Sequence, residues 1–467
     1  MDDSSVSSPL ANIGRIHYLD QVRALAMMVG IFIHACFPYA YGFQENWTIR
    51  DDTSSLAITL GFYFLHLFRM PVFFLIAGFF ANYLYQKRGV KGFLKHRVKR
   101  IGLPFIIFLP LLLIGVTITQ LFSLYYVPEE KMTKNMQQAL VQVKEQIQQA
   151  RAQNSGIPIP AAEDGTTTGL TESEDAFPEN NTSSNVMTEQ KPLTSDGTAE
   201  ADAANNPEER GQDPVITLHL WFLYYLLMFC ACAALLQKFN NRFITRIFST
   251  FFSSPIYVWL LPLVIFPALY SVGVPADTPG HILPRFWAFG YYGVFFLMGW
   301  HFFYHQDYPD KFKKHLGIMI LLSIIALVIY LYMVPVAESF RNTIASDAAL
   351  KNMRAYSGQQ KIYLVTLEAF LSIFLTMITL ILGKRYLNFP NKVMRFISDS
   401  SYLIYLIHWP LVTFIQIFFV TMPFSGYFKF IISSAILLGI GLVTYRYMVR
   451  YTPIGTMLNG KKVRVLA

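Results

Sequence analysis

Long apolar runs are the feature of this sequence that most constrains its fold. A run of 18 residues or more is long enough to cross the hydrocarbon core of a bilayer as a helix. Only 14% of the 467 residues are charged, against roughly 25% in a typical soluble domain. The sequence therefore predicts an all-α, multi-pass membrane bundle of about ten helices. The predicted spans cover residues 22–42, 56–84, 101–124, 215–236, 255–272, 284–304, 316–336, 361–382, 399–420 and 428–449.

The basic residues are spread unevenly between the predicted spans. Segments 87–100, 238–246, 310–314 and 383–395 alternate onto the same side as the C-terminal tail, and all are rich in Lys and Arg. Because basic connections stay in the cytoplasm, this pattern places both termini there. The formal charge of +9 then faces cytoplasmic anionic lipids, so it does not indicate a nucleic-acid partner.

A long polar segment, residues 125–214, separates the third and fourth predicted spans. It holds 16 Asp/Glu against 6 Lys/Arg, and only residues 129–153 have the composition of a polar helix, so the remainder is predicted to be disordered. Its expected role is a tether, with a substrate-guiding arm as the alternative. The chain is thus divided into residues 1–124 (tail, three spans and a basic cytoplasmic loop), 125–214 (acidic extracytoplasmic loop) and 215–467 (seven spans and a basic tail).

The three cysteines, Cys36, Cys230 and Cys232, all lie inside apolar runs. Their spacing fits neither a disulfide framework nor a zinc site, and they are expected to be small apolar core residues. No metal and no permanently bound cofactor are expected.

His34 lies in the middle of the first apolar run, 11 residues after Arg23. A helix rises 1.5 Å per residue, so His34 is expected roughly 16 Å deep if Arg23 marks the cytoplasmic boundary. An imidazole there can be a hydrogen-bonded structural group, or it can exchange a proton with a hydroxyl near neutral pH.

Other ionisable residues also interrupt the apolar runs. His66 and Arg69 share one helix face in the second span, and Glu368 and His408 lie in the eighth and ninth spans. Arg69 keeps its charge, so it needs a carboxylate partner or an anionic ligand. Several buried ionisable groups in one bundle favour a shared polar cavity over independent structural roles.

Two further clusters lie near the predicted membrane surfaces. In KRGVKGFLKHRVKR (87–100), Arg97 and Arg100 lie one turn apart and their guanidinium groups suit phosphate, although a plain positive-inside anchor has the same composition. At the outer end of the fourth span, His219 and Trp221 fit either an interfacial aromatic belt or a sugar-stacking site.

Taken together, these stretches resemble the acyltransferase-3 family of integral-membrane O-acyltransferases. The opening YLDQVRALAMMVGIFIHA separates Arg23 and His34 by ten residues, as in the Arg-x10-His motif of that family. RMPVFFLIAGFF resembles its second helix, and FLKHRVKRIGLPF its basic Arg-x-x-Arg motif. SSYLIYLIHWPLV resembles its late-helix pattern, at Ser401, Tyr402, Tyr405 and His408. The resemblance covers nearly all of the chain except residues 125–214.

The sequence departs from the family pattern in places. Gln21 and Ala24 stand where the family often has glycine, and HLWFLYYL has no acid where many members have Trp-Ser-Leu and a following glutamate. No appended esterase-like domain is expected after the tenth span. HLWFL, at residues 219–223, and the compact C-terminus are more similar to a branch associated with succinylating osmoregulated periplasmic glucans.

The resemblance implies an acyl-CoA donor, succinyl-CoA or acetyl-CoA, on the cytoplasmic side and a glycan acceptor outside. It also implies residence in the bacterial inner membrane, among membrane lipids. It leaves undecided whether the protein forms a homodimer. His34 is expected to act as general base or, less favoured, to carry the acyl group covalently, and Arg23 belongs to the same motif.

The remaining candidate residues follow from this reading. Arg69, His66 and His408 are expected to position the reactants or to hold oxyanion charge, and Arg69 would also hold a succinyl carboxylate. The donor phosphates are assigned to Arg97, Lys99 and Arg100. Contacts to the acceptor are assigned to His219, Trp221 and Glu368.

A proton-coupled secondary transporter is the alternative function, because buried His, Arg and Glu side chains also occur in such carriers. A non-catalytic membrane scaffold is a third class. Release of free CoA thiol from an acyl-CoA in the presence of an acceptor separates the enzyme from both.

Overall fold

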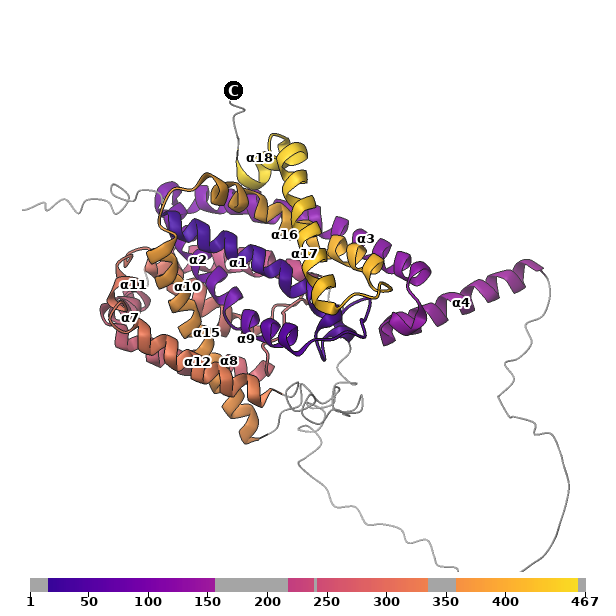
Figure 1. Cartoon of the computed structure of the whole chain (residues 1–467). Coiled ribbons are helices and arrows are strands. Elements are labelled where there is room, and N and C mark those ends of the chain that lie inside the picture. Colours follow the sequence, from indigo (N-terminus) through magenta and orange to yellow (C-terminus); the bar gives the residue numbers. More distant parts are fainter. Residues whose placement is uncertain (1–15, 156–216, 239–241, 335–357, 461–467) are drawn as a thin grey trace, which may run out of the picture. The chain divides into compact units, whose positions relative to one another are not determined.

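The computed structural model describes residues 16–155, 217–238, 242–334 and 358–460 of the chain, and every regular element in these ranges is helical (Figure 1). This confirms the predicted all-α class. The chain divides into two units, residues 1–140 with 215–467, and residues 141–214. The first unit is the helical bundle. The described part of the second, residues 141–155, is the end of helix α4, which agrees with the polar helix predicted over 129–153.

Among the described residues, ten main helices build the bundle. They are α1 (His17–Ala35), α2 (Leu56–Arg97), α3 (Leu103–Tyr126), α6 (Trp221–Lys238), α8 (Leu261–Val272), α10 (Val294–Phe302), α12 (Leu316–Met333), α15 (Gln359–Tyr386), α16 (Lys392–Phe419) and α17 (Gly426–Thr444).

Shorter helices complete the described structure. The α-helices are α4 (Lys134–Ser155), α7 (Arg242–Ser253), α9 (Phe286–Ala288), α11 (Tyr308–Lys311) and α18 (Pro453–Asn459). The 3₁₀ helices are η1 (Phe37–Tyr39), η2 (Gln44–Asn46), η4 (Glu129–Lys131), η5 (Leu218–Leu220) and η6 (Pro255–Leu260). The π-helices are η3 (Val98–Gly102), η7 (Phe289–Gly293) and η9 (Tyr445–Val449).

Helices are found at each of the ten positions where spans were predicted. Within the described residues, seven segments are long and apolar enough to cross a membrane. The first, Leu56–Tyr126, contains α2, η3 and α3 and so covers two predicted spans, whereas α1 and the segment from α9 to α10 are not among the seven. The multi-pass architecture is therefore supported, and the number of ten spans and the cytoplasmic termini stay predictions.

Helix α1 differs from its predicted range of 22–42. It begins at His17 and ends at Ala35, because Pro38 has no N–H to donate to the carbonyl of His34 if the helix continued. The chain then turns through η1 and η2 before α2 begins at Leu56. We call this connection, residues 36–55, the cap segment. His34 consequently lies in the last turn of α1 rather than in the middle of a longer helix.

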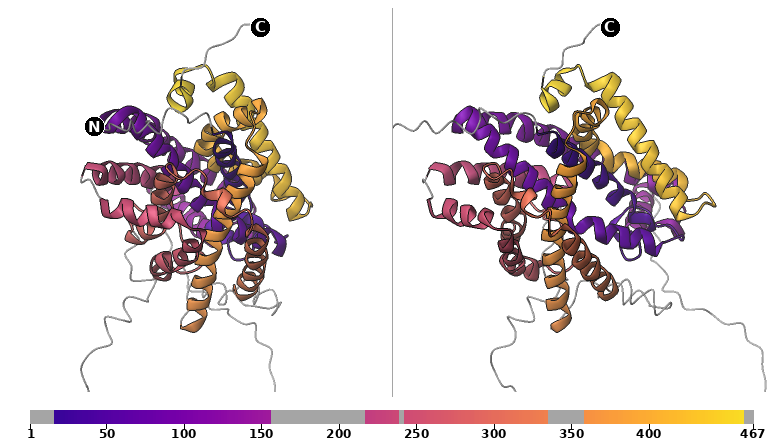
Figure 2. Two further views of the ribbon diagram at one scale, coloured as in Figure 1. Left: turned by 90° about the vertical axis from the view of Figure 1, so that its left-hand side faces the viewer. Right: turned by 60° about the vertical axis from the view of Figure 1, so that its left-hand side comes forward.

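Helix α1 packs against α2 and α16, so the first described helix lies beside one that follows it by more than 350 residues (Figure 1). It runs antiparallel to α2, since Arg23 lies over the ring of Phe80 while Phe37, beyond the other end of α1, contacts Phe62. The yellow C-terminal helices α17 and α18 lie beside α16 (Figure 2). Residues far apart in sequence therefore meet around α1.

Helices α2 and α10 approach each other at two glycines. A Cβ atom at Gly78 would overlap the backbone of Phe296, and one at Gly299 would overlap the backbone of Leu75. Small residues allow helix backbones in a membrane to come into direct contact. This crossing holds the middle of α2, and with it Arg69, in a fixed place in the bundle.

Candidate active site

Three histidines from three separate segments meet inside the bundle. His34 comes from the last turn of α1, His219 from η5 and His408 from the middle of α16. The ring centroids are 5.0 Å apart for His34 and His408, 4.5 Å for His219 and His408, and 6.0 Å for His34 and His219. The sequence predicted His34 and His408 for one cavity and placed His219 at its outer mouth, so its position inside the cluster is a new observation.

Aromatic rings surround these histidines. The ring centroid of Trp409 lies 4.7 Å from that of His34, and its ring stacks on His219 with the centroids 5.6 Å apart. Trp47, from the cap segment, stacks on His34 at 6.3 Å and lies 4.9 Å from Trp409. Phe37 lies 5.7 Å from His34. The cluster is therefore enclosed mainly by apolar surface, where polar interactions are stronger than in water.

One carbonyl oxygen fixes the tautomers of two of these rings. Nε2 of His219 and Nδ1 of His408 lie 2.8 Å and 2.7 Å from the carbonyl oxygen of Tyr405. A carbonyl only accepts hydrogen bonds, so both nitrogens must carry hydrogen. In the neutral rings, Nδ1 of His219 and Nε2 of His408 then carry the lone pairs. Both atoms are buried without a hydrogen-bond partner in the described structure, as is Nδ1 of His34.

The Tyr-x-x-Tyr-x-x-His pattern of α16 explains how these groups are held. The hydroxyl of Tyr402 donates to the carbonyl of Arg100, at 3.0 Å, and the hydroxyl of Tyr405 donates to the carbonyl of His219, at 2.6 Å. The first bond ties α16 to η3 and the second ties it to η5. The motif thus positions His408 and His219 together.

Arg69 of α2 lies against α1 at Gly30, where a Cβ atom would come within 2.5 Å of its Nη1. Its charge acts on all four histidines of this region, His34, His66, His219 and His408. In the described part of the chain Arg69 forms no ion pair with a carboxylate, and its Nε is buried without a partner. A guanidinium held inside the bundle without an acid is suited to an anionic ligand.

His66 and Glu368 are used to hold a loop rather than to line the histidine cluster. Nε2 of His66 donates to the carbonyl of Ala276, at 2.8 Å, and Oε1 of Glu368 accepts from the N–H of Ala276, at 2.9 Å. The hydroxyl of Tyr330 donates to Oε2 of Glu368 at 3.4 Å, and Glu368 is 1% exposed. Both oxygens of Glu368 thus accept hydrogen bonds from the protein, and its assignment to substrate contacts stays a prediction.

Trp221, the other aromatic candidate for an acceptor contact, lies inside the bundle. Its ring is 4% exposed and packs against Tyr292 at 5.2 Å and Phe74 at 6.2 Å. Helix α6 turns this side chain into the apolar interior, and the expected contact with a sugar stays a prediction.

The basic cluster of residues 87–100 is helical, not a loop. Helix α2 continues to Arg97 with only Gly89 in a non-helical conformation, and the π-helix η3 joins it to α3. Arg97 lies over Phe93, with its Nε buried and without a partner, and Arg100 and Gly460 of the C-terminal segment lie close together. Lys99 is exposed. Arg97 and Arg100 are therefore held by the fold, whereas Lys99 faces solvent.

Arg23, near the start of α1, lies close enough to Arg97 for the two charges to act on each other. It contacts Asp20 and the hydroxyl of Ser398, both at 3.3 Å, and its guanidinium lies over Phe80. Asp20 lies one helical turn before Arg23. Arg23 is eleven residues from His34, so it is not in the histidine cluster and does not contact the reacting groups there.

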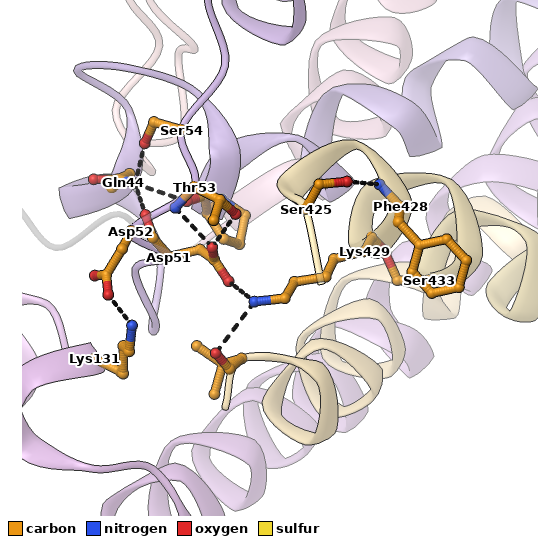
Figure 3. A network of polar contacts seen from close by, with 12 residues as sticks. Gln44, Asp51, Asp52, Thr53, Ser54, Lys131, Ser425, Phe428, Lys429 and Ser433 are labelled. Carbon is orange, nitrogen blue, oxygen red and sulfur yellow. Dashed lines mark hydrogen bonds and ion pairs between the residues drawn. The ribbon is translucent and has the colours of Figure 1, made fainter. Parts of the chain in front are cut away.

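The cap segment is held over the cluster by a polar network that no sequence pattern indicated (Figure 3). Asp51 Oδ2 pairs with Lys429 Nζ at 2.6 Å, with side chains 1% and 3% exposed, and Asp51 Oδ1 accepts from the N–H of Thr53 at 2.9 Å. A second pair joins Asp52 to Lys131, just before α4. These contacts connect the cap segment to α17 and to the segment that follows α3.

Several of these side chains keep accessible surface although they lie inside the bundle. His34, Arg69, Trp409 and Phe37 are only half-buried, whereas His219 and His408 are 4% and 2% exposed. His34 therefore keeps some accessible surface, although its Nδ1 is buried. Within the described residues, no group of three or more His, Cys, Asp or Glu side chains is arranged to hold a metal ion.

The sequence of residues 16–446 matches the profile of a family described as an acyltransferase domain, the acyltransferase-3 family. The chain belongs to the acyltransferase-3 family. As a member it is a multi-pass membrane O-acyltransferase. Similar proteins include glucans biosynthesis protein C of Salmonella paratyphi B, Salmonella agona and Salmonella enteritidis, each 23% identical over 98% of this chain and 97% of the relative. No solved structure matches the chain.

The structure places the two residues of the first-helix motif in different parts of α1: Arg23 lies in the second turn and His34 in the last turn. The residues that sequence reasoning missed are Trp47, Trp409 and the Tyr405 carbonyl. Trp409 is adjacent to His408 and Tyr405 lies within the recognised motif, so both could have been included. Trp47 lies in a connection without periodicity, and no signal in the sequence linked it to His34.

Proposed function

We propose that this acyltransferase moves an acyl group from a cytoplasmic acyl-CoA thioester to a hydroxyl of an extracytoplasmic glycan, at the cluster of His34, His219 and His408. The observation that supports this most is the pair of buried imidazole nitrogens, His219 Nδ1 and His408 Nε2, whose lone pairs are fixed by one carbonyl beside an unpaired Arg69. Proton acceptors next to a buried cation suit a reaction that deprotonates an alcohol and generates an oxyanion.

His34 is the proposed general base, because it is the one histidine of the three that keeps appreciable accessible surface. It takes the proton of the glycan hydroxyl as the oxygen attacks the thioester carbonyl carbon. The tetrahedral intermediate collapses with cleavage of the C–S bond, and the imidazolium returns its proton to the departing CoA thiolate. His219 and His408 can accept hydrogen bonds and so stabilise the imidazolium charge.

Arg69 is proposed to stabilise the oxyanion formed on the thioester carbonyl. Its contact with Gly30 places the guanidinium beside the last turns of α1, and a preorganised cation in a low-dielectric site stabilises developing negative charge. If the acyl group is succinyl, its free carboxylate is an alternative partner for Arg69. Acetyl has no such carboxylate, so comparing the two donors tests this role.

The donor is proposed to enter at the end of the bundle that carries Arg97 and Arg100. Both guanidinium groups are partly buried, and their geometry suits phosphate oxygens better than a lysine does. From Arg23, near this end, to His34 is roughly 16 Å along α1. The phosphates would stay among the arginines while the acyl end extends along α1 to the histidines, and exposed Lys99 would contribute long-range attraction.

The proposed acceptor and location follow from the relatives. Glucans biosynthesis protein C is named for glucan biosynthesis, and we transfer a glycan acceptor to this chain on that basis. We also propose that the enzyme lies in the bacterial inner membrane with both termini in the cytoplasm, which the distribution of Lys and Arg supports.

The test is transfer by the purified protein in detergent. Given succinyl-CoA or acetyl-CoA and a glucan acceptor, the wild-type protein should release free CoA thiol in proportion to glycan acylation measured by mass spectrometry. His34→Ala should abolish both signals while the protein remains folded. Thiol release without glycan acylation would contradict the acceptor, and no thiol release with either donor would contradict the proposed reaction.

A further inference from the structure

Gln416 of α16 uses both ends of its side chain, and the chemistry of its partners leaves only one orientation. It is fully buried; its Nε2 donates to the carbonyl of Ala35 at 2.7 Å, and its Oε1 accepts from Nε1–H of Trp47 at 2.9 Å. A carbonyl only accepts and an indole N–H only donates. A reversed amide would lose both bonds, so the position of this group is fully determined.

The first of these bonds holds the end of α1. Ala35 is the last residue of α1 and follows His34 directly. Carbonyls in the last turn of a helix have no partner within the helix, and a buried one without a hydrogen bond is destabilising. Gln416 supplies that hydrogen bond from the helix that also carries His408. The distance between the two histidines is therefore set by a contact one residue away from His34.

The second bond holds one wall of the cluster. The ring of Trp47 is stacked on His34, with an angle of 24° between the planes, and also contacts Trp409. An indole can slide over neighbouring rings unless its N–H is fixed. Because Gln416 accepts that N–H, it fixes the plane against which His34 lies.

We propose that Gln416 is a positioning residue for the acyl transfer, acting through Ala35 and Trp47 on His34. This inference rests on the proposed function for the role of His34 in the chemistry, but the positioning itself can be measured without activity. Displacing a catalytic group by about 1 Å can reduce turnover on the order of 100-fold, so a residue that acts only by position has a measurable effect.

The principal variant is Gln416→Met, which keeps the length of the side chain and removes both hydrogen bonds. We expect kcat to fall by roughly 100-fold while the KM for acyl-CoA stays within about twofold. Arg97 and Arg100, proposed for donor binding, lie in α2 and η3, away from the end of α1 that Gln416 holds. The matched control is Thr413→Val, three residues earlier on α16. Thr413 is also buried, but the one hydrogen bond that its hydroxyl makes within the described residues is to the carbonyl of Trp409 in its own helix, so the kcat of this variant should be unchanged.

A second measurement does not depend on turnover. Diethylpyrocarbonate modifies accessible imidazoles, and peptide mass spectrometry reports the rate at His34 separately from the rates at His219 and His408. Gln416→Met should raise the rate at His34 at least about threefold by loosening the end of α1. Trp47→Phe, which removes the N–H donor together with part of the ring stacked on His34, should raise it as well. Thr413→Val should leave it unchanged.

These measurements separate the two proposals. If the wild-type protein shows no acyl transfer but Gln416→Met still exposes His34 selectively, the proposed function is wrong and the positioning stands. If the modification rate of His34 is unchanged in Gln416→Met, the positioning role is overturned whatever the transfer assay shows. Equal losses of kcat in Gln416→Met and Thr413→Val would also overturn it, because they would indicate general destabilisation.

Discussion

The carbonyl oxygen of Tyr405 accepts a hydrogen bond from Nδ1 of His408, one turn further along α16, at 2.7 Å. This bond leaves Nε2 of His408 as the lone-pair nitrogen of the neutral ring, buried in the bundle without a partner in the described structure. A main-chain acceptor cannot be removed by a side-chain mutation. The tautomer of His408 is therefore determined by the backbone of its own helix, and the ring itself is the group to change.

Replacing His408 by Phe tests the contribution of that nitrogen. The ring is nearly the same size, so packing against His34 and His219 is largely retained, while the acceptor is lost. We expect kcat for acyl transfer to fall by about 10²- to 10³-fold, as is typical when a group that handles a proton is removed. The thermal unfolding temperature in detergent should change little. Activity within a factor of two of the wild type would exclude His408 from the chemistry.

Gly30→Ala is expected to displace Arg69. The added Cβ would lie 2.5 Å from Arg69 Nη1, so the guanidinium must move, and we expect kcat to fall by about tenfold. Gly61→Ala is the matched control, because a Cβ there meets no atom within 4 Å. Steady-state kinetics of the two variants provide the comparison. Equal kinetics would show that the position of Arg69 does not matter for transfer.

Lys429→Met is expected to destabilise the protein by about 3–5 kcal/mol, because it leaves the carboxylate of Asp51 buried and unpaired. The double variant Asp51→Asn with Lys429→Met should recover much of this loss, since no charge then remains buried. Thermal unfolding of the single and double variants in detergent checks this. If the double variant is as unstable as the single one, the cap segment depends on the charges themselves rather than on their mutual neutralisation.

The Asp310–Lys384 pair should give the fold a pH dependence on the acid side. Burial acts to raise the pKa of Asp310, but hydrogen bonds from Lys384, at 2.7 Å, and from Lys313 lower it below its usual value of 3.8 overall. A carboxyl with a lowered pKa stabilises the fold above the pKa of the unfolded chain, and the effect is lost as the pH falls through the folded pKa. Asp310→Asn should therefore lower the unfolding temperature at neutral pH.

The same substitution should reduce the difference in unfolding temperature between pH 7 and pH values below about 4. Asp307→Asn is the control, because its carboxylate is 67% exposed and lies 3.7 Å from Lys311, a geometry that contributes little. If the unfolding temperature of Asp310→Asn depends on pH in the same way as that of the wild type, this account is contradicted.

The sequence by itself determined the membrane class, the positions of the helices and the family. Runs of apolar residues leave the backbone only one way to satisfy its hydrogen bonds in lipid, which is a helix. The opening motif and the late-helix motif identified Arg23, His34 and His408. These are local or compositional signals, so they can be recognised without any knowledge of how the helices pack.

Only the tertiary structure decided which side chains meet. His219 joins His34 and His408 through a bond to Tyr405, 186 residues away in sequence, and Trp47 reaches α16 through Gln416, 369 residues away. Glu368 and Trp221, equally prominent in sequence, point to a loop and to the apolar core instead. Spacing along one helix gives the face on which a residue lies, but the partner of that face depends on packing between distant segments, which no local pattern records.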